Sequence, residues 1–361
     1  MKKQFFAVIL ACILAFSAVA VTPFPQVKAA GTSSELRGIW ISIFDFASLG
    51  IKDKKKAAFK SAVDDYLDIA EDYGINAVFL QVRAYDDAFW PSKTFPAMTY
   101  LNSKANATKK ASKVYTFDPL DAFIDVAEDH DMEVHAWLNP YRINTTQYLD
   151  PALTASQTRV KKAVKELLDY DLDGIHFDDY FYHATGGYVS PSKRTKAYQV
   201  NITPAKKRSH VNKLIRAVYK LAHNEDMVFG ISPQGNYTND MNSGADVKTW
   251  LSSSGYVDYL APQLYWTNNY GSGQTMYSNC LNQFLSLRKN SAKLYVGLAL
   301  YKGGTNVAGD PGWSTSSYNL RDQVKLMRDA GGSGFILFSA RFLKESAAKA
   351  ERNHLCDYLG L

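Results

Sequence analysis

Residues 174–180 read GIHFDDY, a pattern typical of a buried strand that ends in two adjacent carboxylates, Asp178 and Asp179. Ile175 and Phe177 alternate with more polar neighbours, which is the period of two expected when a strand has a different environment on each face. Two acids side by side repel each other. That repulsion, with partial burial, can split their pKa values into an acid form and a base form. We therefore expect a polar site where this strand ends.

Strand-like and amphipathic helical segments alternate around this stretch, from about residue 36 to the C-terminus. Strands are predicted at 37–43, 77–83, 133–139, 174–180, 228–233, 257–264, 294–300 and 334–339. Helices are predicted at 54–73, 118–131, 156–171, 205–225, 246–254, 275–290, 316–330 and 343–358. Repeated β/α units of this number predict an α/β protein whose residues 36–361 form a single (β/α)8 TIM barrel.

The two faces of each predicted strand differ in the same way. In 77–83, Val78, Leu80 and Val82 form an aliphatic face that would meet the helices, whereas the opposite face becomes polar toward the carboxyl end. Active sites of this fold lie at the carboxyl ends of the strands. The side chains expected to converge there are Trp40, Arg83, Asn139, Asp178, Gln234, Gln263 and Tyr265.

The longest predicted loops, 84–117, 181–204, 265–274 and 301–315, lie on that side of the barrel, and most are rich in Tyr and Trp. Aromatic loops around a polar centre predict a cleft for an extended substrate that contains rings. The indoles expected to stack on sugar faces are Trp40, Trp90, Trp137 and Trp266.

The N-terminus has the pattern of a secretory signal peptide over residues 1–29, followed by a short linker, 30–35. Its removal takes away Lys2, Lys3 and Lys28, so the formal charge falls from +6 to +3, with 38 basic against 35 acidic residues. No basic run remains to bind nucleic acid. We expect a secreted monomer, extracellular or associated with the cell wall, without a membrane anchor after cleavage.

The mature chain keeps two cysteines, Cys280 and Cys356. In an oxidising compartment they could pair, but two free thiols fit the sequence equally well, because spacing alone does not fix the geometry of a disulfide.

Glycoside hydrolysis needs a protonated acid at the leaving oxygen, and either a second carboxylate or the substrate's N-acetyl group at the anomeric carbon. Asp178 and Asp179 fit the N-acetyl arrangement, because no Glu lies near the end of a predicted strand. We favour Asp179 as the general acid and Asp178 as the group that orients the acetamido group or acts as base, with the reverse assignment open. A distant second carboxylate from Asp86, Asp87 or Asp240 is the alternative.

Two other functions compete with hydrolysis. A metal-dependent deacetylase would gather His135, His176 and His183 with the two aspartates, but their spacing matches no established metal motif. We therefore expect neither a metal nor another cofactor. A non-catalytic barrel that binds cell-wall glycan is the second alternative.

Several motifs occur in a characteristic order: LRGIWIS at 36–42, QVR at 81–83, DAFW at 87–90, HAWLNPYR at 135–142, DGIHFDDYFY at 173–182, GISP at 230–233 and APQLYW at 261–266. Together they resemble the glycosyl-hydrolase-like family ten, a bacterial cell-envelope family with a TIM barrel. Within it, the chain is similar to peptidoglycan hydrolases that act on denuded glycan.

The resemblance implies cleavage between N-acetylmuramic acid and N-acetylglucosamine in strands stripped of stem peptides. The Asp pair on the fourth strand is also similar to that of N-acetylglucosaminidase families that use substrate-assisted catalysis. The substrate-binding residues expected from all these observations are Trp40, Arg83, Asp87, Trp90, Trp137, Asn139, Arg142, Tyr180, Gln234, Gln263, Tyr265 and Trp266.

Overall fold

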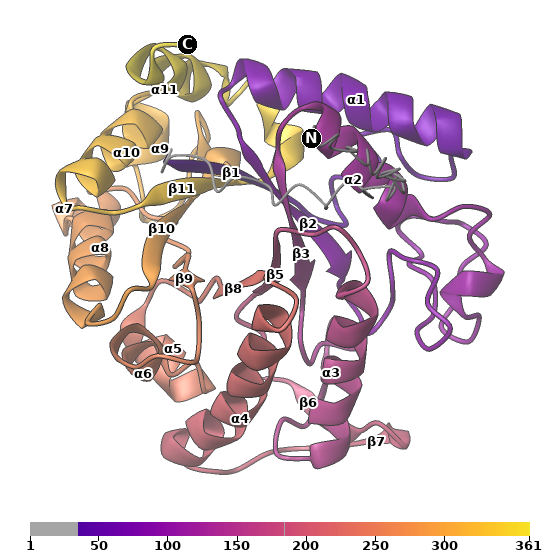
Figure 1. Cartoon of the computed structure of the whole chain (residues 1–361). Helices are drawn as coiled ribbons and strands as arrows, with labels where there is room; N and C mark the ends of the chain where they lie inside the picture. The colour runs from indigo at the N-terminus through magenta and orange to yellow at the C-terminus, as the bar shows by residue number, and fades with distance from the viewer. Residues whose placement is uncertain (1–34, 184) are drawn as a thin grey trace, which may run out of the picture. The chain divides into compact units, whose positions relative to one another are not determined.

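Parallel strands close into a barrel in the order β1-β11-β10-β9-β8-β5-β3-β2, with helices around it (Figure 1). The computed structural model describes residues 35–183 and 185–361. The predicted signal peptide and nearly all of the linker lie outside these residues. The strands are β1 (Leu36–Ile41), β2 (Ala77–Arg83), β3 (Glu133–Leu138), β5 (Gly174–Phe177), β8 (Val228–Ile231), β9 (Tyr259–Leu260), β10 (Lys293–Leu298) and β11 (Gly334–Phe338). The predicted TIM barrel is confirmed, and β5 lies inside the sheet between β3 and β8.

The predicted helices are all present, with ends that shift by a few residues. They are α1 (Lys56–Asp72), α2 (Pro119–Asp129), α3 (Thr154–Leu167), α4 (Pro204–His223), α6 (Val247–Ser252), α8 (Met276–Leu287), α10 (Asn319–Asp329) and α11 (Lys349–Leu359). At the start of α2, the Asp118 side chain accepts from the backbone N–H groups of Leu120 and Asp121, and Pro119 occupies the first turn. No helix within the described ranges is both long enough and apolar enough to cross a membrane.

Each strand divides its side chains between two cores, as the alternation predicts. Val78, Leu80 and Val82 of β2 belong to the large core between the barrel and the helices. Phe79 belongs instead to a smaller core inside the barrel, which it shares with Trp40 and Trp137. The side chains that occupy the barrel interior near its carboxyl end therefore come from one parity class of each strand.

A glycine makes room for the polar part of this interior. A Cβ atom on Gly230 would lie 2.0 Å from the ring of Tyr259, so only glycine fits there. The Tyr259 hydroxyl then reaches His176 Nδ1 at 3.0 Å and His135 Nδ1 at 3.3 Å. The two histidines are thus held within the barrel.

The structure differs from the sequence prediction in three places. The strand predicted at 174–180 ends at Phe177, and the one at 257–264 shrinks to Tyr259–Leu260. The loops after β3 and β5 form an unpredicted three-stranded sheet of β4 (Gln147–Leu149), β6 (Gly187–Ser190) and β7 (Lys193–Tyr198). Its strands are short, and the sequence of β7, KRTKAY, lacks the apolar alternation on which strand prediction depends.

Other short helices lie in the connections: α5 (Tyr237–Ser243), α7 (Tyr270–Gly273) and α9 (Gly312–Thr315). Cys280 in α8 is buried and Cys356 in α11 is partly buried, and both are free thiols. Of the two states left open by the sequence, the structure contains the unpaired one.

Candidate active site

Asp178 and Asp179 follow β5 directly, at the carboxyl end of the barrel. Asp178 continues the inward parity of His176 and is only 2 % exposed. Its Oδ1 accepts from the backbone N–H of Tyr180 at 3.2 Å, and its Oδ2 has no hydrogen-bond partner among the described residues. Asp179 is partly buried, and its Oδ1 accepts from Gln263 Nε2 at 3.3 Å. Because the strand has ended at Phe177, consecutive side chains no longer point to opposite faces, and both carboxyls reach one cavity.

The surroundings of the two carboxyls favour different protonation states. Burial, and then the neighbouring charge of Asp179, raise the pKa of Asp178 well above the ordinary value, although the backbone N–H of Tyr180 and the charge of Arg142 oppose this rise. Burial also raises the pKa of Asp179, but hydrogen bonding from its own backbone and from the Gln263 and Gln234 side chains opposes that rise. A proton shared by this pair therefore resides on Asp178, while Asp179 is the better carboxylate.

The two carboxyls line a cavity of ≈ 190 Å³ at the mouth of the barrel. Nine of the sequence-predicted site residues meet there, namely Trp40, Trp137, Asn139, Arg142, Asp178, Asp179, Tyr180, Gln263 and Tyr265. Sequence reasoning missed Ser42, Phe44, Gln81, Ser232 and Phe338, which also line it. Most of these could have been found from strand parity, because Ser42, Gln81, Ser232 and Phe338 share the inward class of their strands. The cavity thus combines aromatic walls, amides and one acid pair.

Hydrogen bonds between neighbouring strand ends fix the orientation of the amides. Gln81 Oε1 accepts from the backbone N–H of Ile43, and its Nε2 donates to Asn139 Oδ1, both at 3.0 Å. Below them, Trp40 Nε1 donates to His176 Nε2 at 3.3 Å. The site is therefore held on rigid strands rather than on loops alone.

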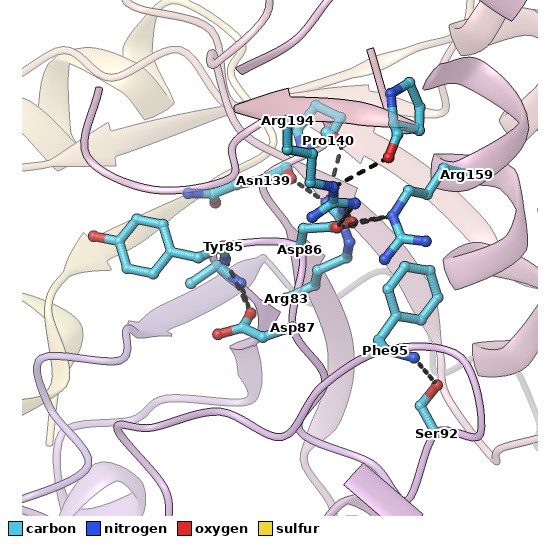
Figure 2. Close-up of polar contacts among 12 residues, drawn as sticks. Arg83, Tyr85, Asp86, Asp87, Ser92, Phe95, Asn139, Pro140, Arg159 and Arg194 are labelled. Atoms are coloured by element: carbon cyan, nitrogen blue, oxygen red, sulfur yellow. Dashed lines mark hydrogen bonds and ion pairs between the residues drawn. The ribbon is translucent and has the colours of Figure 1, made fainter. Parts of the chain in front are cut away.

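Five predicted substrate-binding residues do not line the cavity, and four of them have other contacts. Arg83 is fully buried, donates to the carbonyls of Asn139 and Pro140, and pairs with Asp86 (Figure 2). Asp87 accepts from the backbone N–H groups of Ala84 and Tyr85, and so stabilises the turn after β2.

The two remaining members of this group are tryptophans. Trp90 is buried and donates to Glu166 Oε2 at 3.0 Å. Trp266 packs edge-on against Tyr270, with 6.4 Å between ring centres.

Gln234 also lies outside the cavity lining, but its side chain interacts with Asp179 and its backbone N–H donates to Asp240. The position of Arg83 on the inward face of its strand was predictable from the sequence, but its ion pair with buried Asp86 was not.

None of the candidates for a distant second carboxylate lines the cavity. Burial alone would raise the pKa of Asp86, but the charges of Arg83, Arg159 and Arg194 bring it below the ordinary value. Burial raises the pKa of Asp87 to about 6, with backbone hydrogen bonds opposing the rise. Burial also raises the pKa of Asp240, which lies behind Gln234. Within the described residues, the adjacent pair is therefore the acid pair that faces the cavity.

The histidines considered as metal ligands have other partners. His176 interacts with Trp40, Tyr259 and Ser232, and His135 stacks on Phe79. In the described ranges, the group of side chains close enough to share a metal ion is Asp68, Glu71 and His130, outside the cavity. The histidines and aspartates considered for a metal-dependent deacetylase are therefore not close enough together to bind one metal ion.

Three comparisons with known proteins agree with this architecture. The sequence profile of the family Glycosyl hydrolase-like 10 matches residues 35–147 and 142–315. Glycosyl hydrolase DigH from Escherichia coli K12 is 26% identical, over 92% of this chain and 89% of its own. Glycosyl hydrolase YngK from Bacillus subtilis 168 is 28% identical, over 85% and 68% respectively.

Solved structures with the same fold include a family 18 N-acetylglucosaminidase from Paenibacillus barengoltzii, with a TM-score of 0.54, 11% identity and coverage of 91% of this chain and 100% of that one. A family 18 chitinase from Cycas revoluta, in complex with allosamidin, has a TM-score of 0.55 at 9% identity and covers 90% and 100%. At these identities the likeness shows the TIM-barrel fold alone. The sequence match is the stronger observation, because it spans most of the barrel and includes β5 and the Asp178–Asp179 pair that follows it. On that match, the chain belongs to the glycosyl hydrolase-like 10 family.

Proposed function

We propose that the protein is a secreted glycoside hydrolase that cleaves N-acetylated glycan, specifically the bonds between N-acetylmuramic acid and N-acetylglucosamine in peptide-free peptidoglycan. One observation carries the proposal: two adjacent carboxyls with different surroundings lie in an aromatic cavity at the carboxyl end of the barrel. Curated relatives that carry the name glycosyl hydrolase support the reaction class. A structural neighbour titled spore cortex-lytic enzyme, from Bacillus megaterium, shares the barrel with a TM-score of 0.50.

The proposed reaction uses the substrate's own acetamido group as the nucleophile. Asp178 carries the proton and gives it to the glycosidic oxygen as the bond to the anomeric carbon breaks. The acetamido oxygen bonds to that carbon and closes a cationic oxazolinium ring, whose N–H donates a hydrogen bond to ionised Asp179. Water then opens the ring, and its proton returns to Asp178. This assignment is the reverse of the one favoured by the sequence, because Asp178 is the more buried carboxyl.

The walls of the cavity supply the surfaces on which a sugar ring can lie. Trp40, Trp137 and Tyr265 present aromatic rings, and Asn139 and Gln263 present amides to hydroxyl or N-acetyl oxygens. Phe44, at the rim, leaves 53% of its surface exposed, so it can contact the next sugar along the chain. A polymer that passes over the barrel mouth would meet both the acid pair and these rings.

The test is digestion of purified peptide-free glycan strands, followed by measurement of new reducing ends and by mass spectrometry of the products. The proposal expects products that end in N-acetylmuramic acid or N-acetylglucosamine, with the acetyl groups retained. Binding without new reducing ends would instead support a non-catalytic glycan-binding barrel. Release of acetate that stops with a chelator would support a metal-dependent deacetylase.

A further inference from the structure

Arg142 is the one cationic side chain among the described residues that line the cavity. Its Nε donates to the Asn144 carbonyl at a long 3.4 Å. Within the described ranges, its terminal nitrogens have no hydrogen-bond acceptor and form no ion pair with a carboxylate. The other arginine considered for the site, Arg83, is fully committed to Asp86 and two carbonyls. Arg142 is therefore a cation in the cavity whose strongest donors are free.

The structure holds this guanidinium between two aromatic rings. Its central carbon lies 4.2 Å from the ring centre of Tyr180 and 5.0 Å from that of Tyr85. Tyr180 in turn stacks on Tyr148, with 6.2 Å between ring centres. The backbone of Arg142 forms a β-bridge with that of Tyr148 in β4. Arg142 and the stacked tyrosine are therefore held by the same short strand. A guanidinium fixed in this way loses little freedom when it binds an anion.

We propose that Arg142 binds a carboxylate of the glycan and thereby selects the acidic, peptide-free form of the substrate. The planar guanidinium matches a carboxylate with two parallel hydrogen bonds. In peptide-free strands the lactyl group of N-acetylmuramic acid ends in a free carboxylate. Attachment of a stem peptide converts that group to a neutral amide, and a chitin-type glycan has none. This inference rests on the proposed function and names the feature of the substrate that the site reads.

The acid pair does not prevent this binding. Asp178 is the carboxyl that retains its proton, so the pair holds one negative charge rather than two. Arg142 acts on Asp178 by its charge without forming an ion pair with it. An incoming carboxylate would therefore meet a cation that no protein carboxylate has neutralised.

The test compares peptide-free strands with the same strands after their lactyl carboxyls have been reduced to alcohols. We expect kcat/KM of the unmodified protein to be about 10- to 100-fold higher on the acidic strands, the value of a charge-assisted hydrogen-bond pair. Arg142→Gln should bring this ratio close to one, and Arg142→Lys should leave an intermediate ratio, because a lysine keeps the charge but not the planar fork.

Arg321→Gln is the matched control. Arg321 also lies 4.2 Å from a tyrosine ring, that of Tyr318, but on the exposed face of α10 and away from the cavity. Arg321→Gln removes one positive charge and one cation–π contact. We expect this variant to keep the same ratio of kcat/KM on acidic strands to kcat/KM on reduced strands as the unmodified protein. A ratio near one for the unmodified protein, or a ratio that Arg142→Gln leaves intact, would overturn the inference.

A binding measurement separates failure of this inference from failure of the proposed function. Titration calorimetry of the unmodified protein with both kinds of strand needs no cleavage. Tighter binding of acidic strands that depends on Arg142 would uphold the inference even if no reducing ends appear, in which case the hydrolase proposal fails alone. Equal binding of both strands, with cleavage of both, would contradict the carboxylate site and leave the hydrolase proposal standing.

Discussion

Asp178 and Asp179 are chemically identical neighbours, yet the protein surrounds them differently. Asp178 is almost wholly buried, and one of its oxygens has no hydrogen-bond partner within residues 35–183 and 185–361, whereas Asp179 accepts from an amide of Gln263. The sequence could predict the pair and its place at the end of a strand. It could not predict which member keeps the proton, because that depends on amides from strands that are distant in the sequence.

The first expectation concerns the two single substitutions. Asp178→Asn should lose about 10²–10⁴-fold in rate on polymeric glycan, since it removes the general acid. It should retain substantial activity on an aryl glycoside whose leaving group needs no proton. Asp179→Asn should lose activity on both substrates, because the acetamido group is no longer oriented. Parallel kinetics on the two substrates will measure this, and the opposite pattern would exchange the two roles.

The second expectation concerns pH. The active form needs Asp179 ionised and Asp178 protonated, so kcat/KM should rise as pH passes the pKa of Asp179 and fall as it passes the pKa of Asp178. Burial raises both pKa values above the usual 3.8, so both limbs of the bell should lie at higher pH than for exposed aspartates. A pH–rate profile on peptide-free strands measures both limbs. An optimum at or below about pH 4 would be inconsistent with the assignment.

The third expectation links the same residue to stability. The folded-state pKa of Asp178 is raised, so its contribution to stability is present below the unfolded value of about 3.8 and is lost as pH rises toward the folded value. Asp178→Asn removes this pH-dependent loss of stability, because an amide does not ionise. The variant should melt higher than the parent at neutral pH and show a smaller difference near pH 3. Thermal unfolding at the two pH values will decide, and a variant that melts lower at neutral pH would argue against a strained carboxyl.

At the scale of elements, the alternation of apolar residues was enough to predict the barrel, because each strand has one face toward the helices and one toward the interior. Ser42 and Gln81 belong to the inward class and line the cavity, although neither was among the predicted site residues. Arg83 also faces inward, but its guanidinium pairs with Asp86 and with two backbone carbonyls and does not line the cavity. Parity shows which residues face inward, but it does not show which of them have found partners within the protein.

The ion-pair network of Asp86 joins three elements and yields the fourth expectation. Asp86 pairs with Arg83 of β2, Arg159 of α3 and Arg194 of β7, and its side chain is fully buried (Figure 2). Asp86→Asn would leave buried guanidinium charge without its counter-ion, which typically costs about 3–5 kcal/mol. Urea unfolding will measure this change in the free energy of unfolding.

Asp322→Asn is the control for this substitution. It breaks an ion pair with Arg321 whose side chains are 53% and 38% exposed, so it should cost less than about 1 kcal/mol. Equal effects of the two substitutions would show that the Asp86 network contributes little to stability.

At the scale of the whole molecule, the sequence predicted a single barrel from about residue 36 onward, and the structure agrees over residues 35–361. What it could not place was the small sheet of β4, β6 and β7. Those strands are stabilised by contacts between two distant loops, with a register that joins Tyr148 to Tyr188, and such contacts leave no local periodicity. Tyr148 of this sheet stacks on Tyr180 beside Arg142, so the part hardest to predict supports one wall of the site.

The fifth expectation also concerns the whole barrel. Cys280 and Cys356 are free, so a reductant should not change the melting temperature of the barrel, residues 35–361. Both thiols should react with a thiol reagent after denaturation. Differential scanning fluorimetry with and without reductant, together with thiol titration, will measure this. A lower melting temperature in reductant would reveal a disulfide between α8 and α11.

The most direct test of the central claim is a crystal structure of the Asp178→Asn variant with a peptide-free glycan fragment bound. We expect an N-acetylated sugar in the cavity, with its scissile oxygen within hydrogen-bond reach of residue 178. The acetamido N–H should donate to Asp179, and the acetamido oxygen should lie beneath the anomeric carbon. A fragment bound away from this cavity, or one whose acetamido group points away from Asp179, would contradict substrate-assisted hydrolysis by the acid pair.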